Sequence, residues 1–120
     1  MNWSAAGAAT LALAVAMGAF GAHALKGRLD AYGMGIWEKA VFYHFIHALG
    51  LLVVPVLGKV GAIGAPGRVC VLLAAGILLF SGSLYVLALS GVLPLGAVTS
   101  FGGLCFIAAW LLLAWELLRG

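Results

Sequence analysis

Four long apolar stretches fill almost the whole chain and restrict it to one kind of fold. They are residues 3–25, 36–58, 68–90 and 97–118. Each contains about 22 residues, and a helix that rises about 1.5 Å per residue needs about 20 to cross a hydrocarbon core of about 30 Å. Because lipid offers no hydrogen-bond partner to the backbone, segments this apolar cross a bilayer as helices. The sequence predicts an all-α protein, a four-helix transmembrane bundle with short loops.

The composition supports this prediction. Hydrophobic residues make up 66% of the chain and charged residues 8%, and the mean hydropathy is +1.25. The connecting segments are too short for an extramembrane domain, so we expect residues 1–120 to form a single transmembrane domain. The few Lys and Arg residues do not cluster, which argues against a nucleic-acid surface. The expected partners are the lipid bilayer and either a second copy of the chain or a subunit of a membrane complex.

The cations give only a weak prediction of orientation. Three of them, Lys26, Arg28 and Lys39, fall on the side of the first and third loops. The other three fall on the side of the second loop and the termini. If Lys39 is set aside because it lies inside the second span, the positive-inside rule favours both termini in the cytoplasm. The near balance would also suit a protein inserted in both orientations.

Polar side chains inside the spans are the most informative candidates for a site, because a polar group in hydrocarbon is costly and usually has a purpose. Placing each span antiparallel to the next puts most of these side chains in the half of the bilayer that faces the first and third loops. The opposite half reads as nearly pure Leu, Val, Ala and Ile. The predicted polar cluster consists of His23, Glu38, Tyr43, His44, His47, Ser81, Ser83, Tyr85 and Thr99.

Three contacts within this cluster can be predicted from depth and periodicity. His44 and His47 share one face of the second span, and Ser81, Gly82 and Ser83 should mark a close approach of the third span to that face. His23 lies level with Glu38, so we expect the two to pair. We also expect a Gln to be tolerated at position 44, and a Leu at position 47 to destabilise the bundle.

The chain carries no sequence signature of an enzyme or a metal site. It has no HExxH, GxSxG, GxxxxGK[ST] or CxxC pattern. His44 and His47 could supply two metal ligands, but His23 lies about 9 Å away in depth at about 1.5 Å per residue. A haem held by two histidines would draw them from opposite sides of the ring. We therefore expect no catalytic residues, no metal and no cofactor.

Three sequence words resemble a known family. They are Gly18 to Lys26 (GAFGAHALK), Tyr43 to Leu49 (YHFIHAL) and Phe80 to Tyr85 (FSGSLY). With Gly102-Gly103 and Trp110, they make the whole chain similar to the YgdD-like proteins related to transmembrane protein 256. The resemblance implies a small multi-pass protein of bacterial inner membranes without an established activity. That family often has Gln at the position of His44, and Thr-Pro in place of Thr99-Ser100.

The leading interpretation is a non-enzymatic integral membrane protein with a structural or accessory function. One alternative is a small oligomeric transporter, which the balanced charges would allow. Such transporters carry an essential Glu deep in the first span, where this chain has none. The second alternative is a quinone- or haem-associated accessory subunit of a membrane complex, suggested by His23, Tyr43, His44 and His47.

Overall fold

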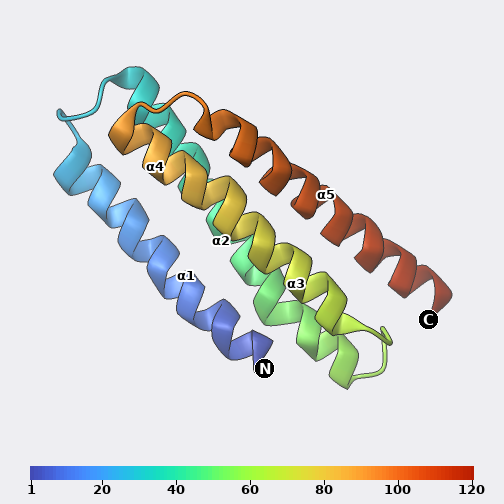
Figure 1. Cartoon of the computed structure of the whole chain (residues 1–120). Coiled ribbons are helices and arrows are strands. Elements are labelled where there is room, and N and C mark those ends of the chain that lie inside the picture. Colours follow the sequence, from blue (N-terminus) through green and yellow to red (C-terminus); the bar gives the residue numbers. More distant parts are fainter.

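The computed structural model describes residues 1–120, and it contains four helical crossings (Figure 1). The first is α1 (Trp3–Phe20), continued by the π-helical turn η1 (Gly21–Leu25), and the second is α2 (Ala31–Lys59). The third is one continuous helix made of α3 (Pro66–Gly76), the π-helical segment η2 (Ile77–Gly82) and α4 (Ser83–Ser90). The fourth is α5 (Leu95–Arg119). The all-α four-helix prediction is confirmed, and the helices extend up to five residues beyond the expected ranges.

The ends of the helices follow from local sequence. Asn2 and Asp30 cap α1 and α2 by accepting from the backbone N–H groups of Ala5 and Gly33. Pro66 occupies the first turn of α3, where its missing N–H costs nothing. Gly91 ends α4 with a φ of 70°, a left-handed conformation that favours glycine. These signals keep the loops short, so consecutive crossings are antiparallel.

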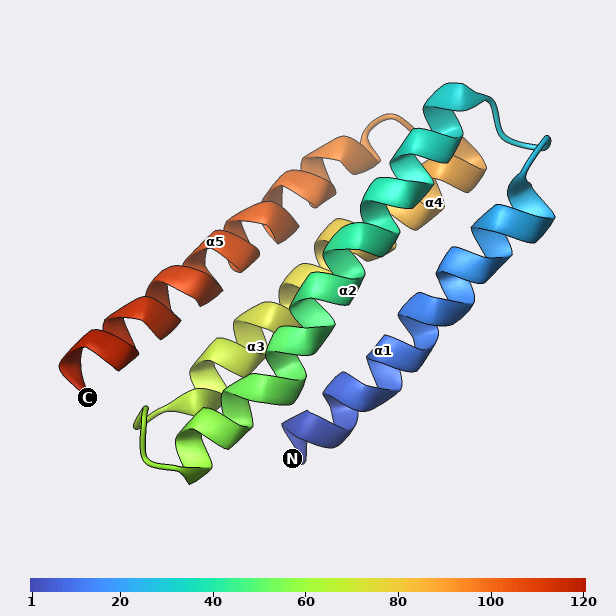
Figure 2. The same cartoon turned by 180° about the vertical axis from the view of Figure 1, so that it is seen from behind.

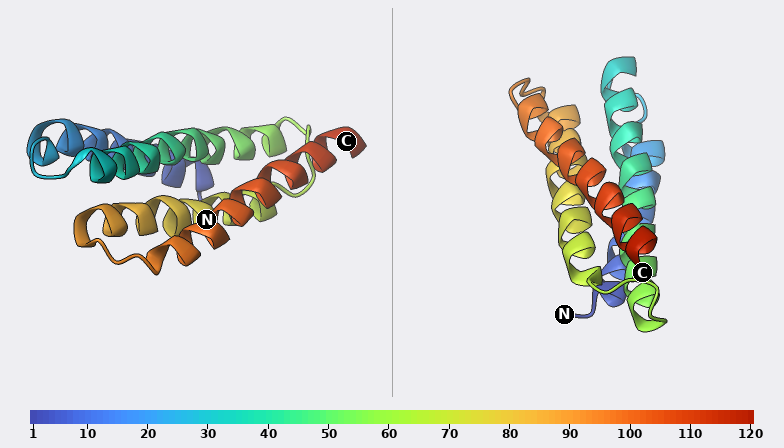
Figure 3. Two further views of the ribbon diagram at one scale, coloured as in Figure 1. Left: turned by 90° about the horizontal axis from the view of Figure 1, so that it is seen from above. Right: turned by 90° about the vertical axis from the view of Figure 1, so that its right-hand side faces the viewer.

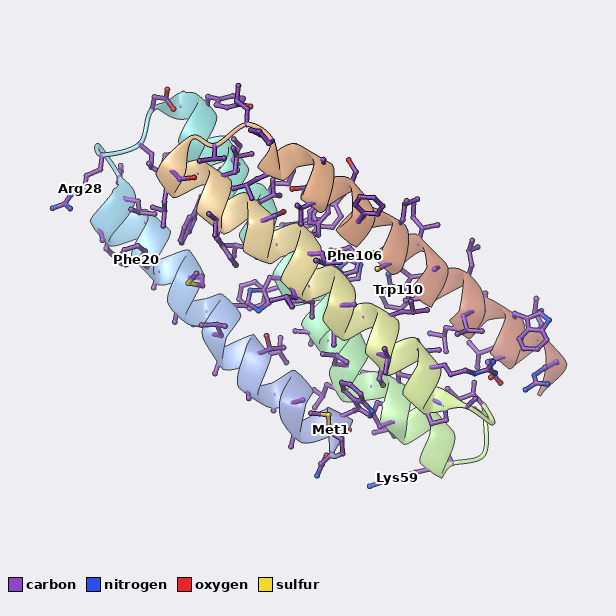
Figure 4. All side chains as sticks on the ribbon, viewed as in Figure 1. Met1, Phe20, Arg28, Lys59, Phe106 and Trp110 are labelled. Carbon is purple, nitrogen blue, oxygen red and sulfur yellow. The ribbon has the colours of Figure 1, made fainter.

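Both termini lie at the same end of the bundle, beside the loop between α2 and α3 (Figures 1 and 2). Figure 4 shows Arg28 at one end of the molecule, with Lys59 and Met1 at the other. The molecule is elongated, with extents of 49 × 26 × 21 Å. The first and third loops therefore share one membrane surface, and the second loop and the termini share the opposite one.

The helix α2 and the third crossing form the centre of the bundle, and α1 and α5 lie on the outside. The helix α2 packs against α1 on one side and against α3, η2 and α4 on another, while α5 packs against the third crossing (Figure 3). The buried positions of α2 include Trp37, Ala40, His44, His47 and Leu51, whose spacing places them on one face. This confirms the predicted shared face of the two histidines. Most of α1 and α5 faces outward, toward the lipid.

Small residues bring α1 close to α2. Three buried positions on this crossing, Gly7, Ala14 and Gly21, recur every seven residues. A side chain at Gly7 would collide with the backbone at Leu51 and Leu52, 2.6 to 3.0 Å from the built Cβ. A repeat of seven residues keeps one seam of a helix in contact with its neighbour when the two helices wind around each other in a left-handed supercoil. In a membrane, such close backbone approach supplies the attraction that hydrophobicity does not.

Two other glycines determine how α5 packs. A Cβ on Gly102 would collide with the backbone of Phe80 in η2, and a Cβ on Gly76 would collide with the ring of Phe106. Gly82, in contrast, would meet only its own helix at 3.9 to 4.0 Å. The prediction that Gly82 marks the close approach is therefore wrong. Gly82 lies between two serines that bond to neighbouring helices, and its own Cβ position meets no other helix.

Candidate functional site

His44 connects three of the four crossings. Its imidazole lies in the centre of the bundle and is 1% exposed. Nε2 is 2.8 Å from Oγ1 of Thr10 on α1, and Nδ1 is 2.8 Å from the hydroxyl of Tyr85 on α4. Both ring nitrogens are thus used inside the protein. The sequence predicts that Tyr85 lies near the depth of His44, but it does not predict Thr10 as a partner of His44.

Further hydrogen bonds join side chains of one helix to backbone carbonyls of another. Ser81 donates to the carbonyl of Ala40 at 2.8 Å, which is the predicted approach of the third crossing to the histidine face. The indole of Trp37 donates to Met17 at 2.8 Å, and Ser4 donates to Leu52 at 3.0 Å. A carbonyl already bonded within its helix retains a second lone pair for such a donor. These bonds fix α1 and the third crossing against α2.

Ser83 points toward α5 and not toward the histidines. Its hydroxyl forms a short hydrogen bond with that of Thr99. Each hydroxyl also lies near a carbonyl of its own helix, that of Phe80 or of Leu95. Because a hydroxyl has one proton, one of the two donates across to the other helix and the other donates to its own carbonyl. The part of the prediction that placed Ser83 against the His44 and His47 face is wrong, because Ser81 and Ser83 lie about 200° apart on a helix. The pair joins the third crossing to the fourth.

His47 and Tyr43 line an open groove between α2 and α5, which we call the α2/α5 groove. Its volume is about 440 Å³. The lining residues are Phe42, Tyr43, Ile46, His47, Phe80, Gly103, Phe106, Ile107 and Trp110. Figure 4 shows Phe106 and Trp110 on the part of α5 that borders the third crossing. Five of the nine are Phe, Tyr or Trp, so most of the wall is aromatic.

The imidazole of His47 uses only one of its nitrogens inside the protein. Nδ1 donates to the carbonyl oxygen of Tyr43 at 2.7 Å. Because a carbonyl only accepts, the neutral ring carries its proton on Nδ1 and a lone pair on Nε2. Nε2 has no partner in the protein, yet every fully buried side-chain nitrogen and oxygen has one. This nitrogen therefore reaches the surface of the α2/α5 groove, although His47 as a whole is 4% exposed.

The predicted pair of His23 and Glu38 does not form. Both residues are exposed, and no hydrogen bond or ion pair joins them. In η1 the residues that face α2 are Gly21 and Leu25, so His23, two residues from each, points outward. Glu38 follows the buried Trp37 by one position and lines an open groove between α2 and the first crossing, with Gly21 and Ala22 on the other wall. Depth counted along the sequence alone does not predict which side chains of neighbouring helices pair.

A second polar cluster lies at the opposite end of the bundle, where the sequence suggested only apolar residues. Glu116 on α5 is 1% exposed. Its carboxylate accepts from Arg68 at 3.0 Å, from Arg119 at 3.4 Å and from the backbone of Gly64 at 3.3 Å. This cluster holds α5 against the start of α3 and the preceding loop. The signal was present in the sequence, since Glu116 is the one acidic residue of the last span and Arg68 begins the span beside it.

The contacts define what these side chains can do chemically. No three His, Cys, Asp or Glu side chains converge as a metal-ligand set. His44 has no free nitrogen for a haem iron, because Thr10 and Tyr85 occupy both. Ser81 and Ser83 have hydroxyls bonded to Ala40 and Thr99, and no His or carboxylate activates either one. The one buried polar atom that is open to a ligand is Nε2 of His47.

Fold and contacts together define a small multi-pass membrane protein whose helices are joined by buried polar side chains. The chain belongs to the family described as "Protein of unknown function (DUF423)", whose model matches residues 17–103. The matched range contains every residue of the predicted polar cluster, whereas Thr10 and Glu116 lie outside it. The expectation of a small membrane-protein family without an established activity is confirmed.

Several bacterial relatives resemble the chain over most of their length. The UPF0382 membrane protein YwdK of Bacillus subtilis is 45% identical over 108 residues, which cover 89% of this chain and 88% of the relative. The UPF0382 membrane proteins SH2409 of Staphylococcus haemolyticus and SERP0230 of Staphylococcus epidermidis are 47% and 49% identical over 107 residues, with 89% and 87% coverage in both cases. No solved structure matches the chain.

Proposed function

We propose that this chain is a non-enzymatic accessory protein of the bacterial inner membrane that acts through its lipid-facing surface, with both termini in the cytoplasm. The observation that carries the proposal is that every fully buried side-chain nitrogen and oxygen is hydrogen-bonded within the protein. A catalytic or transport interior needs polar groups that a substrate can reach. Here the interior polar groups hold helices together, so a partner or ligand meets the outer surface.

The arrangement of the interior favours this proposal over a transporter. The polar cluster around His44 and the cluster around Glu116 are separated by a core of buried apolar side chains that includes Leu51, Val54 and Leu73. A transport path would need polar groups along the whole crossing. The deepest free polar atom, on His47, faces the side of the bundle and not a central channel.

The resemblance to the YgdD-like proteins and transmembrane protein 256 is part of the proposal, and it supports the bacterial inner membrane as the location. The cations support the orientation. If Lys39 is left out because it lies inside α2, the side of the first loop has two cations, Lys26 and Arg28. The side of the termini has three, at positions 59, 68 and 119. The positive-inside rule then places the termini in the cytoplasm.

Reporter fusions that are active on only one side of the membrane test the proposal when placed at either terminus. We expect both termini in the cytoplasm in all molecules, with no inverted population. Purified protein in liposomes should leave proton and potassium gradients intact at all protein-to-lipid ratios. Equal populations of the two orientations, or dissipation of a gradient that depends on the protein, would instead support the transporter alternative.

A further inference from the structure

We propose that the α2/α5 groove binds the reduced head group of a lipid-soluble quinone, whose hydroxyl donates to Nε2 of His47. The proposal rests on the proposed function, because it names a ligand class for an accessory membrane protein. His47 lies near the midpoint of α2 (Ala31–Lys59), and therefore near the middle of the bilayer. A ligand that reaches this nitrogen must dissolve in hydrocarbon.

The free nitrogen is the first reason for a hydroxyl-bearing ligand. Nε2 carries a lone pair, since Nδ1 donates its proton to Tyr43 at 2.7 Å. Acyl chains have no donor, so lipid alone leaves this acceptor unpaired in a medium where an unpaired polar group is costly. A charged imidazole in the same place would be costlier still. The groove therefore favours a neutral ligand with an O–H group.

The walls of the groove favour a flat ring. The imidazole of His47 stacks on the ring of Phe106, with centroids 3.4 Å apart and planes 10° apart, so its edge is held in a fixed direction. Phe80 lies 5.5 Å from Phe106, and Trp110 lies 5.7 Å from His47. Aromatic ligands pack on such rings in offset or tilted arrangements. The volume of about 440 Å³ lies within the usual range for small-molecule sites.

Tyr43 supplies a second polar group and makes the site selective. Its hydroxyl has no partner within the protein, and its ring is nearly parallel to His47 at 5.9 Å. A hydroquinone has two hydroxyls, one to donate to Nε2 and one to exchange a hydrogen bond with Tyr43. An oxidised quinone only accepts, so it can use Tyr43 but not Nε2. The site should thus prefer the reduced form, and binding involves no electron transfer.

The experiment uses the full chain in lipid nanodiscs under anaerobic conditions, with decylubiquinol and decylubiquinone as probes. Selective ¹⁵N labelling of the three histidines reports on each ring nitrogen. We expect decylubiquinol to shift the unprotonated nitrogen of His47 and to leave both nitrogens of His44 unchanged. Decylubiquinone should bind about tenfold more weakly, the effect of losing one hydrogen bond in hydrocarbon.

Two variants and one control test the assignment to the groove. His47→Phe keeps a ring to stack on Phe106 and removes the acceptor, so affinity for decylubiquinol should fall about tenfold. Gly103→Leu should fill the groove without a backbone collision, because its Cβ would meet only the ring of Phe80 at 3.7 to 3.8 Å. It should abolish binding even if His47→Phe fails to fold. His23→Phe makes the same replacement at an exposed position outside the groove and should bind normally.

Equal affinity for the two redox forms, or normal binding by Gly103→Leu, would overturn the proposal. The proposal would also be overturned if position 103 formed a crosslink between two copies of the chain and the protein did not respond to the quinol. The groove would then be a dimer interface. These outcomes differ from failure of the proposed function. An accessory protein of single orientation without quinol binding would refute only this inference, whereas inverted insertion or gradient dissipation would refute the function itself.

Discussion

Among the single side chains, His44 and His47 show how the same residue type on one helix face can have opposite consequences. His44 is bonded at both nitrogens, to Thr10 and Tyr85, and these bonds join three crossings. His47 bonds only to a carbonyl of its own helix and keeps one nitrogen free. The cost of an apolar replacement should therefore be larger at His44. The sequence predicts only that Gln is tolerated at position 44 and that Leu at position 47 is destabilising, because it reveals the shared face but not the partners.

Replacing His44 tests this assignment. His44→Leu should lower the free energy of unfolding by about 1–3 kcal/mol, because it leaves the buried Tyr85 hydroxyl without a partner. His44→Gln keeps a donor and an acceptor and should cost less. The measurement is denaturant or thermal unfolding in detergent, with His23→Leu as the exposed control. Adding Tyr85→Phe to His44→Leu should cost little further; full additivity of the two changes would contradict the hydrogen bond.

Glu116 differs from the histidines because its partners are exposed while it is buried. Arg68→Met leaves a buried carboxylate with Arg119 and Gly64 only, whereas Glu116→Gln leaves two arginines that water can solvate. The arginine variant should therefore lose more thermal stability than the glutamine variant. Hydrogen exchange should rise first in the last turns of α5. Equal loss in the two variants would show that the carboxylate is better solvated than its burial indicates.

Helix packing here depends on a few glycines, and their position in the sequence does not reveal which ones. The chain has 18 glycines, and those in contact with another backbone, such as Gly7 and Gly102, are indistinguishable by composition from Gly82. The π-helical segment η2 contributes to this, because an extra residue in a turn rotates the face that the following residues present. Depth in the membrane follows from counting residues, but rotation about the helix axis depends on such irregularities.

Gly102 and Gly82 form a matched pair for an experiment. Gly102→Ala places a methyl group against the backbone of Phe80 and should cost about 1–3 kcal/mol, since overpacking forces the helices apart. Gly82→Ala meets nothing closer than 3.9 Å and should be neutral or stabilising by up to about 1 kcal/mol, the usual helix preference for Ala. Unfolding in detergent measures both. Similar losses in the two variants would contradict the close contact between α5 and η2.

For the molecule as a whole, the sequence predicts the number of crossings and their antiparallel order, because lipid leaves an apolar backbone few options. It also places Ser81 and Tyr85 near the histidine face, because counting residues along antiparallel spans gives the approximate depth of each side chain in the bilayer. It does not predict Thr10 as the partner of His44, the outward direction of His23, or the ion cluster of Glu116. Each of these depends on which helices are neighbours and on their rotation, and four apolar helices can be arranged in several ways with similar burial.

Orientation is the property of the whole molecule most sensitive to a single charge. Without Lys39, the first-loop side has two cations and the side of the termini has three. One Lys added to the first-loop side makes the two counts equal, and one added to the side of the termini makes that side the clear majority. Leu93 and Val60 are both 72% exposed and lie in loops at opposite ends. Leu93→Lys should produce two orientations, whereas Val60→Lys should strengthen insertion with the termini inside. Reporter fusions at both termini measure the populations. If Leu93→Lys inserted like the unmodified chain, Lys and Arg in the short loops would not be what sets the orientation, and the buried Glu116 cluster would be the next determinant to test.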